Sequence, residues 1–150
     1  MRINKLTDYS IVILTNMVIN GDKKMYTAKE LSEITDIPLP TVTRILKMLS
    51  NKELLASQQG PQGGYSLTKS AENISVREVI EAMEGPIALT ECSDDDCGCA
   101  YETSCAVGKP WQKINKAIID VLQNINLAEM GMKDESQQLL KLTNITEMIS

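Results

Sequence analysis

The order of capping and turn residues between positions 27 and 69 constrains the fold more than any other feature of the sequence. Thr27 and Glu30 form a capping-box pattern, which predicts a short helix that ends near Asp36. After a short break, Pro40 stands where a proline suits the first turn of a second helix, TVTRILKMLSNKE. Two short helices joined by a tight turn are therefore predicted, which is the helix-turn-helix layout.

A β-hairpin is predicted directly after the second helix. The segments LLASQQ and YSLTK have the pattern of short strands, and they flank GPQGG, a turn rich in Gly and Pro. A hairpin in this place is the wing of a winged helix-turn-helix. Its glycines, between Gly60 and Gly64, would let the backbone of the tip approach a phosphate closely.

The outer face of the second helix and the wing together predict a surface that binds DNA. The apolar stripe of this helix consists of Val42, Ile45, Leu46 and Leu49. Basic and hydroxyl side chains lie off the stripe, as expected for a helix that enters the major groove. The candidate DNA-contacting residues are Pro40, Thr41, Thr43, Arg44, Lys47, Gln59, Gly60, Gln62 and Tyr65. Taken alone, the two basic residues could equally be solvated charges, and Arg44 is the candidate reader of guanine.

Further helices are predicted on both sides of this unit. Thr7 is expected to cap the first helix, and Ser75 with Glu78 forms a second capping box, for VREVIEAMEG. After Lys109 a long amphipathic helix is expected, with an apolar stripe made of Trp111, Ile114, Ile118, Val121, Leu122 and Ile125. One small domain cannot bury all of that stripe. The helix is therefore interpreted as a dimerisation helix, with packing on its own domain as the alternative.

The predicted fold class is mainly α with a small β-hairpin, a winged helix-turn-helix domain followed by a long C-terminal dimerisation helix. The DNA-binding domain with its connecting helix is expected over residues 1–85, and a cysteine-containing loop over 86–108. The dimerisation helix is expected over 109–132, and a flexible tail over 133–150.

The composition excludes several classes of function. The chain has no histidine, which removes the commonest general base and the Ser-His and Cys-His pairs, so an enzyme is not expected. The net charge of −5 comes from residues 86–150, because residues 1–85 carry equal numbers of acidic and basic side chains. A local face can therefore still attract DNA. No signal peptide or apolar run of membrane-spanning length is found, so the cytoplasm is the expected location.

All four cysteines fall within ECSDDDCGCAYETSC, residues 91–105. In a reducing compartment such a group more often binds a metal or senses redox state than forms a structural disulfide. The three consecutive aspartates disfavour free thiolates by like-charge repulsion, whereas a bound metal deprotonates its thiol ligands. The C-x4-C-x1-C-x5-C spacing differs from the paired knuckles of zinc sites. The composition favours a metal centre over a bare thiol switch, and iron–sulfur, zinc and thiol switching all stay open at this point.

Over about residues 1–132 the chain resembles the IscR/NsrR-like (Rrf-two) family of iron–sulfur winged-helix transcriptional regulators. The matching stretches include MRINKLTDY, IPLPTVTRILKML, GPQGGYSL and ISVREVIEAMEGPIALTEC. AMEGPIALTEC and CAVGKPWQKIN look most like the branch that controls the SUF iron–sulfur assembly operon. The resemblance implies a homodimer that binds double-stranded promoter DNA and senses cluster status, iron or redox stress. The alternatives are a nitric-oxide- or redox-sensing regulator of the same fold and a DNA-binding protein with a structural zinc site.

The resemblance also implies the ligands of a two-iron or four-iron cluster. Gly108 stands where one branch of the family has a ligating histidine, and another branch instead takes an aspartate from the first helix of the partner subunit. The implied ligands here are Cys92, Cys99, Cys105 and Asp8. The competitors for the fourth position are Cys97, Asp94, Asp95, Asp96 and Glu102.

Overall fold

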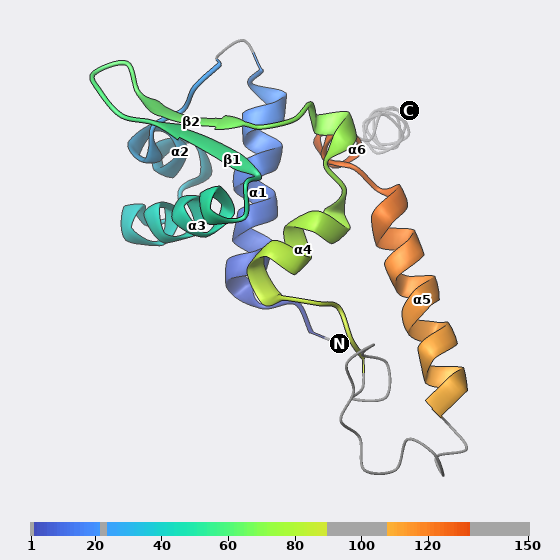
Figure 1. Ribbon diagram of the computed structural model, residues 1–150. Coiled ribbons are helices and arrows are strands. Elements are labelled where there is room, and N and C mark those ends of the chain that lie inside the picture. The colour runs from blue at the N-terminus through green and yellow to red at the C-terminus, as the bar shows by residue number, and fades with distance from the viewer. Residues whose placement is uncertain (1, 22–23, 90–107, 133–150) are drawn as a thin grey trace, which may run out of the picture.

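The computed structural model of the chain describes residues 2–21, 24–89 and 108–132 (Figure 1). Its elements are α1 (Lys5–Ile19), α2 (Ala28–Thr35), α3 (Leu39–Asn51), β1 (Leu55–Gln58), β2 (Gly64–Leu67), the 3-10 helix η1 (Ala71–Asn73), α4 (Val76–Glu84), α5 (Gly108–Asn124) and α6 (Leu127–Gly131). The predicted class, mainly α with one small hairpin, is confirmed. Figure 1 shows α2, α3 and the tip of the hairpin on one side of α1, and α5 on the other.

The predicted helix-turn-helix is present and its local signals act as expected. The Thr27 hydroxyl accepts a hydrogen bond from the Glu30 N–H at 3.2 Å, and the Glu30 carboxylate accepts one from the Thr27 N–H at 2.8 Å. Helix α2 ends where Asp36 adopts a left-handed conformation with φ of 59°. Pro40 lies in the first turn of α3, where its missing N–H costs no helical hydrogen bond.

The predicted start of the first helix is wrong by one turn. Asn4, not Thr7, caps α1, and its side-chain oxygen accepts a hydrogen bond from the Leu6 N–H at 2.7 Å. Thr7 lies inside the helix and is fully buried. Its hydroxyl donates to the carboxylate of Glu84, at the end of α4, at 2.7 Å. Asn4 thus caps the helix, and Thr7 instead bonds across the domain to the end of α4.

The hydrophobic core lies where α1, α2, α3, α4 and the hairpin meet, and it is almost entirely aliphatic. Side chains with no measurable exposure include Ile13, Leu14, Leu31, Val42, Ile45, Leu46, Leu49, Ile74, Val79 and Leu127. Tyr26 is the aromatic residue buried among them, at 4% exposure. The sequence lacks Phe, so branched aliphatic side chains provide most of the area removed from water.

The helix predicted over 109–132 is not continuous, which corrects that expectation. Helix α5 ends at Asn124, and Asn126 caps the separate helix α6 by accepting a hydrogen bond from the Glu129 N–H at 2.9 Å. Between the two helices, the Ile125 carbonyl accepts from the Val76 N–H at 2.8 Å. The Leu127 N–H donates to the Ile74 carbonyl at 2.9 Å. These bonds replace helical ones, so the chain turns back and α6 packs against α1 of its own subunit.

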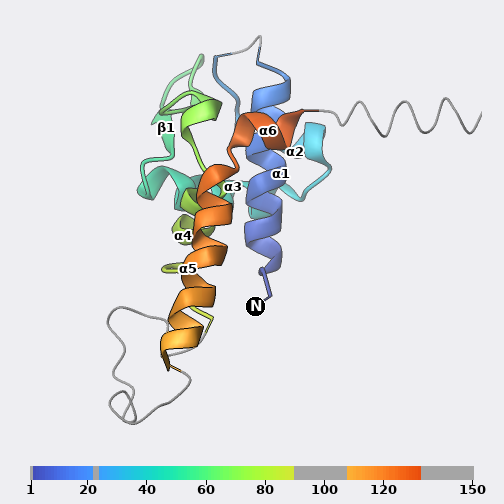
Figure 2. The ribbon, with the colours of Figure 1, turned by 90° about the vertical axis from the view of Figure 1, so that its right-hand side faces the viewer.

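The apolar residues of α5, together with Ile125 just after it, lie on two different faces. Ile119, Leu122 and Ile125 pack against a small cluster formed by Val76, Ile80 and Ile87. Trp111, Ile114 and Val121 stay exposed, at 38%, 45% and 59%. Figures 1 and 2 show α5 running alongside α4 and continuing past it. In the part of the chain that the structure describes, no helix has both the length and the apolar character needed to cross a bilayer.

Candidate nucleic-acid interface and cysteine segment

Helix α3 presents a polar face because its opposite face is anchored in the core. Val42, Ile45, Leu46 and Leu49 are all completely buried, which leaves the helix one orientation. Pro40, Arg44 and Lys47 are then exposed, and Thr41 and Thr43 are half-buried. Neither Arg44 nor Lys47 forms an ion pair with another described residue. The structure therefore brings the predicted residues of this helix to one accessible surface.

The hydroxyl of Thr43 is already engaged within the helix. It donates a hydrogen bond to the Leu39 carbonyl at 2.9 Å, a common arrangement for a threonine in a helix. This bond uses the hydroxyl hydrogen and leaves the oxygen lone pairs and the methyl group of Thr43 unused. Thr43 can therefore accept a hydrogen bond or make an apolar contact, but donating one would cost the internal bond.

The wing tip has the predicted position and depends on glycine backbone geometry. Gln59, Gly60 and Gln62 are exposed in the loop that joins β1 to β2. Gly60 has φ of +113°, which favours glycine, and its carbonyl accepts from the Gly63 N–H at 2.9 Å. A Cβ on Gly64 would lie 2.6 Å from the carbonyl oxygen of Tyr26. Close approach of two backbones thus requires glycine at the end of the tip.

Tyr65 lies at the base of the wing rather than at its tip. Its N–H donates to the Tyr26 carbonyl at 2.7 Å, and its carbonyl accepts from the Tyr26 N–H at 2.9 Å. The side chain is half-buried and packs against the core. This two-way pairing ties the wing to the segment before α2. A contact between Tyr65 and DNA stays a prediction, and its visible role is to hold the wing against the helices.

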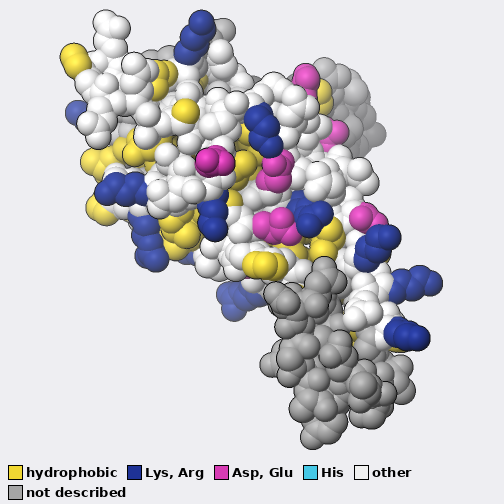
Figure 3. Space-filling view, viewed as in Figure 1, with side chains coloured by type: hydrophobic (Ala, Val, Ile, Leu, Met, Phe, Trp, Pro, Cys, Tyr) yellow, Lys and Arg dark blue, Asp and Glu magenta, His cyan; other side chains and the backbone are white. Residues whose placement is uncertain are grey.

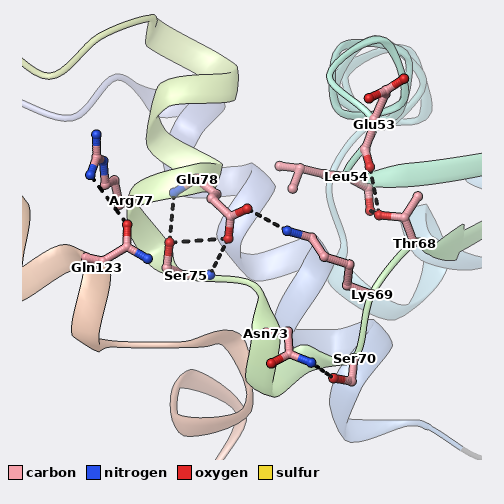
Figure 4. Close-up of polar contacts among 10 residues, drawn as sticks. All are labelled: Glu53, Leu54, Thr68, Lys69, Ser70, Asn73, Ser75, Arg77, Glu78 and Gln123. Atoms are coloured by element: carbon pink, nitrogen blue, oxygen red, sulfur yellow. Dashed lines mark hydrogen bonds and ion pairs between the residues drawn. The ribbon is translucent and has the colours of Figure 1, made fainter.

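Polar contacts secure both the wing and the start of α4 (Figure 4). The Thr68 hydroxyl donates to the Glu53 carbonyl at 2.7 Å, which joins the end of the wing to the turn after α3. The Lys69 ammonium forms an ion pair with the Glu78 carboxylate at 2.7 Å. The Glu78 carboxylate also accepts from the Ser75 N–H at 2.9 Å, and the Ser75 side chain accepts from the Glu78 N–H, so the predicted capping box is confirmed. Burial raises the pKa of Glu78, but the bonds from Lys69 and Ser75 outweigh it and lower the pKa overall.

The charges on the surface are unevenly distributed. Figure 3 shows Lys and Arg side chains over α3 and along α5, whereas Asp and Glu side chains lie nearer to α4. The chain as a whole carries −5, so a favourable field for DNA exists only locally. The face of α3 that includes Arg44 and Lys47 carries exposed positive charges, which suit a phosphate backbone.

The four cysteines belong to the part of the chain that lies outside the described residues. Cys92, Cys97, Cys99 and Cys105 lie in residues 90–107, outside the described residues, as do the competing acidic ligands. The described chain stops at Leu89, shortly after α4, and resumes at Gly108, the first residue of α5. In the ranges that are described, no three His, Cys, Asp or Glu side chains are grouped so that they could hold a metal ion.

Asp8 lies near the start of α1 and its side chain is exposed. It lines an open hollow of about 650 Å³ together with Arg2, Ile3, Asn4, Lys5 and Ile11. Its N–H donates to the Asn4 carbonyl at 3.1 Å, as a residue early in a helix does. The carboxylate is thus accessible from outside the subunit, as a ligand supplied to a partner would have to be.

Two residues beside the cysteine segment were not predicted from the sequence. Asn115 of α5 is 4% exposed; its amide accepts from the Leu89 N–H and donates to the Ile87 carbonyl, both at 3.1 Å. Glu84 accepts from the Asn4 N–H at 2.8 Å as well as from Thr7. An asparagine inside the apolar stripe WQKINKAII was the signal that could have identified the first. Nothing local marks Glu84, because its partners lie at the other end of the domain.

The chain matches known proteins along most of its length. A family model described as Rrf2, iron-dependent transcriptional regulator, matches residues 3–133. The HTH-type transcriptional regulator IscR of Sodalis glossinidius is 29% identical over 135 residues, which cover 90% of this chain and 81% of that protein. A putative HTH-type transcriptional regulator, ORF2 of Azotobacter vinelandii, is 27% identical and covers 95% of this chain and 86% of its own length.

Solved structures show the same fold. CymR, the global cysteine regulator of B. subtilis, superposes with a TM-score of 0.68 at 21% identity, over 87% of this chain and 96% of its own. IscR of T. potens superposes with a TM-score of 0.66 at 22% identity, over 87% of this chain and 85% of its own. At these identities the likeness concerns the fold, which is that of the predicted winged helix-turn-helix.

Proposed function

This chain belongs to the Rrf2 family and is a DNA-binding transcriptional regulator, and we propose that an iron–sulfur cluster controls its hold on promoter DNA. The family and the relatives are transcriptional regulators rather than enzymes, which confirms the prediction made from the missing histidine. The observation that carries the proposal is the place of the cysteine-bearing residues. They lie in the chain between α4, which packs against α1 and α3, and α5.

The donor set fits an iron–sulfur cluster by its chemistry. Cys92, Cys99 and Cys105 provide soft thiolate sulfur, the usual ligand of such clusters, and the sequence has no histidine to complete a mixed site. We assign these three as ligands and Asp8 of the partner subunit as the fourth. A bound two-iron or four-iron cluster would make the protein sensitive to iron supply, oxidation and nitric oxide.

The accessible position of Asp8 supports its role as a ligand supplied in trans. It lies one residue from Thr7, whose hydroxyl is bonded to the end of α4. A cluster held by one subunit and by Asp8 of the other would fix the separation of the two α3 helices. Two half-sites are read together only when that separation suits the groove. If Asp8→Ala protein kept the full difference between cluster-loaded and cluster-free operator affinity, this tether would be excluded.

A homodimer is proposed from the exposed edge of α5. Ile114, Ile118 and Val121 recur at steps of four and three residues, the spacing of a helix–helix seam. Ile114 and Val121 are among the most exposed large apolar side chains of the described chain. Burying this edge against a second copy would remove it from water. A cytoplasmic homodimer bound to double-stranded promoter DNA is therefore the proposed working form.

Direct readout of the promoter is assigned to the α3 face and the wing tip. Arg44 is the proposed reader of guanine, with Pro40, Thr41, Thr43 and Lys47 beside it. Gln59, Gly60 and Gln62 of the wing tip are assigned to the phosphate backbone or the adjacent groove. The genes of SUF-type iron–sulfur assembly are the proposed targets, on the resemblance of the segments that flank the cysteines.

The decisive experiment titrates a candidate operator with anaerobically purified protein, before and after removal of iron. Cluster-loaded protein should be brown, with visible absorbance lost in air or chelator, and the two forms should differ in operator affinity. Replacing Cys92, Cys99 and Cys105 together by Ala should abolish the colour and that difference, whereas the matched control Cys97→Ala should keep both. Colourless protein with stoichiometric zinc, or equal affinity of the two forms, would overturn the proposal.

A further inference from the structure

Helix α5 has one buried polar side chain among the apolar residues that pack against its own subunit. Asn115 is 4% exposed, although Ile119 and Leu122 on the same face pack against apolar residues of α4 and of the segment after it. Burying an amide costs free energy unless its hydrogen-bonding groups have partners. The partners of Asn115 therefore indicate what its side chain does. Leucine would fill this position without that cost.

The bonds of Asn115 hold the last described residues before the cysteines. Its Oδ1 accepts from the Leu89 N–H at 3.1 Å, and its Nδ2 donates to the Ile87 carbonyl at 3.1 Å. The side chain thus pairs with the backbone as a neighbouring strand would, on both an acceptor and a donor. Ile87 is itself 8% exposed and packs against Val76 and Ile80. The backbone at 87–89 is therefore fixed relative to both α4 and α5.

A second set of polar contacts joins the end of α4 to the start of α1. Glu84, the last residue of α4, accepts from the Asn4 N–H at 2.8 Å and from the Thr7 hydroxyl at 2.7 Å. Both partners belong to the start of α1, whose later residues Ile13 and Leu14 lie in the same core as α3. Consecutive contacts therefore link Leu89, α5, α4 and α1.

We propose that Asn115 is a positioning residue that couples the cysteine segment to the DNA-reading domain. The inference rests on the proposed function and deepens it. Because the amide holds both Ile87 and Leu89, a displacement of the chain beyond Leu89 is passed to α4 and α5 instead of being absorbed by backbone rotation. Loss of the amide would leave cluster binding and DNA binding possible but would uncouple them.

The test compares two variants with one matched control. Asn115→Ala removes the amide and leaves a cavity, and Asn115→Leu removes the amide but refills the space. Asn124→Ala makes the same chemical change at an exposed position of the same helix. For each, operator affinity is measured with cluster-loaded and cluster-free protein, and exchange of the Leu89 amide hydrogen is followed in the cluster-free form.

We expect both Asn115 variants to lower the ratio of the two affinities at least fivefold, with cluster-free affinity within twofold of wild type. The Leu89 amide should exchange at least tenfold faster in both, and Asn124→Ala should behave as wild type. If Asn115→Leu kept the wild-type ratio, the amide would serve only to fill space and the inference would fail. Slow Leu89 exchange in that variant would also overturn it. A wild-type ratio of one would instead reject the proposed function.

Discussion

The DNA-reading unit, formed by α2, α3 and the hairpin, and the helix α5 use their apolar residues in opposite ways. In α3, Val42, Ile45, Leu46 and Leu49 are fully buried within the subunit. In α5, Ile114 and Val121 remain 45% and 59% exposed. The core that orients α3 is therefore closed within a single chain, and the outer face of α3 has its orientation in the isolated subunit. Helix α5 presents an apolar edge that only a further surface can cover.

Polar residues repeat this contrast. On α3 the charged side chains Arg44 and Lys47 point to solvent, where charge is inexpensive. Beside the cysteine segment, Asn115 and Thr7 are buried and their polar groups are paired across elements. The first arrangement suits recognition of an external partner. The second suits the transfer of small displacements within the subunit, because a buried hydrogen bond is costly to leave unmade.

The largest expected effect comes from breaking the reading unit itself. Leu46→Ala removes a fully buried side chain from α3 and should lower the free energy of unfolding by about 2–5 kcal/mol, measured by chemical denaturation. Lys52→Ala, at the exposed end of the same helix, should change it by less than about 0.5 kcal/mol. Equal effects of the two substitutions would mean that the core of this unit is not closed within one chain.

The next effect tests the opposite character of α5. Val121→Glu places a carboxylate on the exposed apolar edge and should leave the folded subunit intact. Burying one valine is worth about 1.5–3 kcal/mol, so the dissociation constant of the proposed dimer should rise at least about tenfold in analytical ultracentrifugation. Gln112→Glu adds the same charge elsewhere on α5 and serves as the control. An unchanged dimer in the Val121 variant would place the subunit contact elsewhere.

A smaller effect distinguishes recognition of a DNA base from attraction to the phosphate backbone on α3. Arg44→Ala should cost about 1–3 kcal/mol on the preferred operator and relax discrimination at one base pair in each half-site. Lys116→Ala, which removes an exposed positive charge from α5, should leave both unchanged. Binding measured on a panel of operators with single base changes distinguishes the roles. Uniform weakening on every sequence would make Arg44 a phosphate contact.

The smallest effect concerns Glu78, which lies between the two regions. Its pKa is lowered from 4.5 in the folded state, so it stabilises the fold above its unfolded pKa and loses this contribution as pH falls through its folded pKa. The contribution should be at most about 1 kcal/mol, because the pair with Lys69 is partly exposed. Glu78→Gln should flatten the loss of unfolding free energy below pH 4.5. Glu72→Gln, at an exposed position, should retain the wild-type slope.

The elements of the reading unit could be predicted from the sequence because their signals are local. The capping boxes at Thr27 and Ser75, Pro40 in the first turn of α3 and the glycines of the wing act on neighbours a few residues away. The apolar stripe of α3 likewise has one helical period and one buried face. The candidate residues of this helix therefore share one surface, as expected.

The break near Ile125 could not be predicted in this way. The stripe of α5 continues in a helical period through that residue, and Asn126, which caps the next helix, is the one local signal of a break. Backbone bonds from Ile74 and Val76, about fifty residues earlier in the chain, compete with the helical ones and win. Tyr65 is a similar case, because its backbone pairing with Tyr26, which holds the base of the wing, also joins residues distant in the chain.

The sequence by itself determined the winged helix-turn-helix, its basic outer face and the confinement of every thiol to one acidic segment. Those properties depend on residue type, spacing and short-range capping, which act before the chain is compact. Only the tertiary structure decided that Asn4 rather than Thr7 caps α1 and that α5 ends at Asn124. It also decided that Asn115 forms hydrogen bonds with the backbone of Ile87 and Leu89. In each case the deciding contact is a hydrogen bond between residues distant in the chain, which no local pattern encodes.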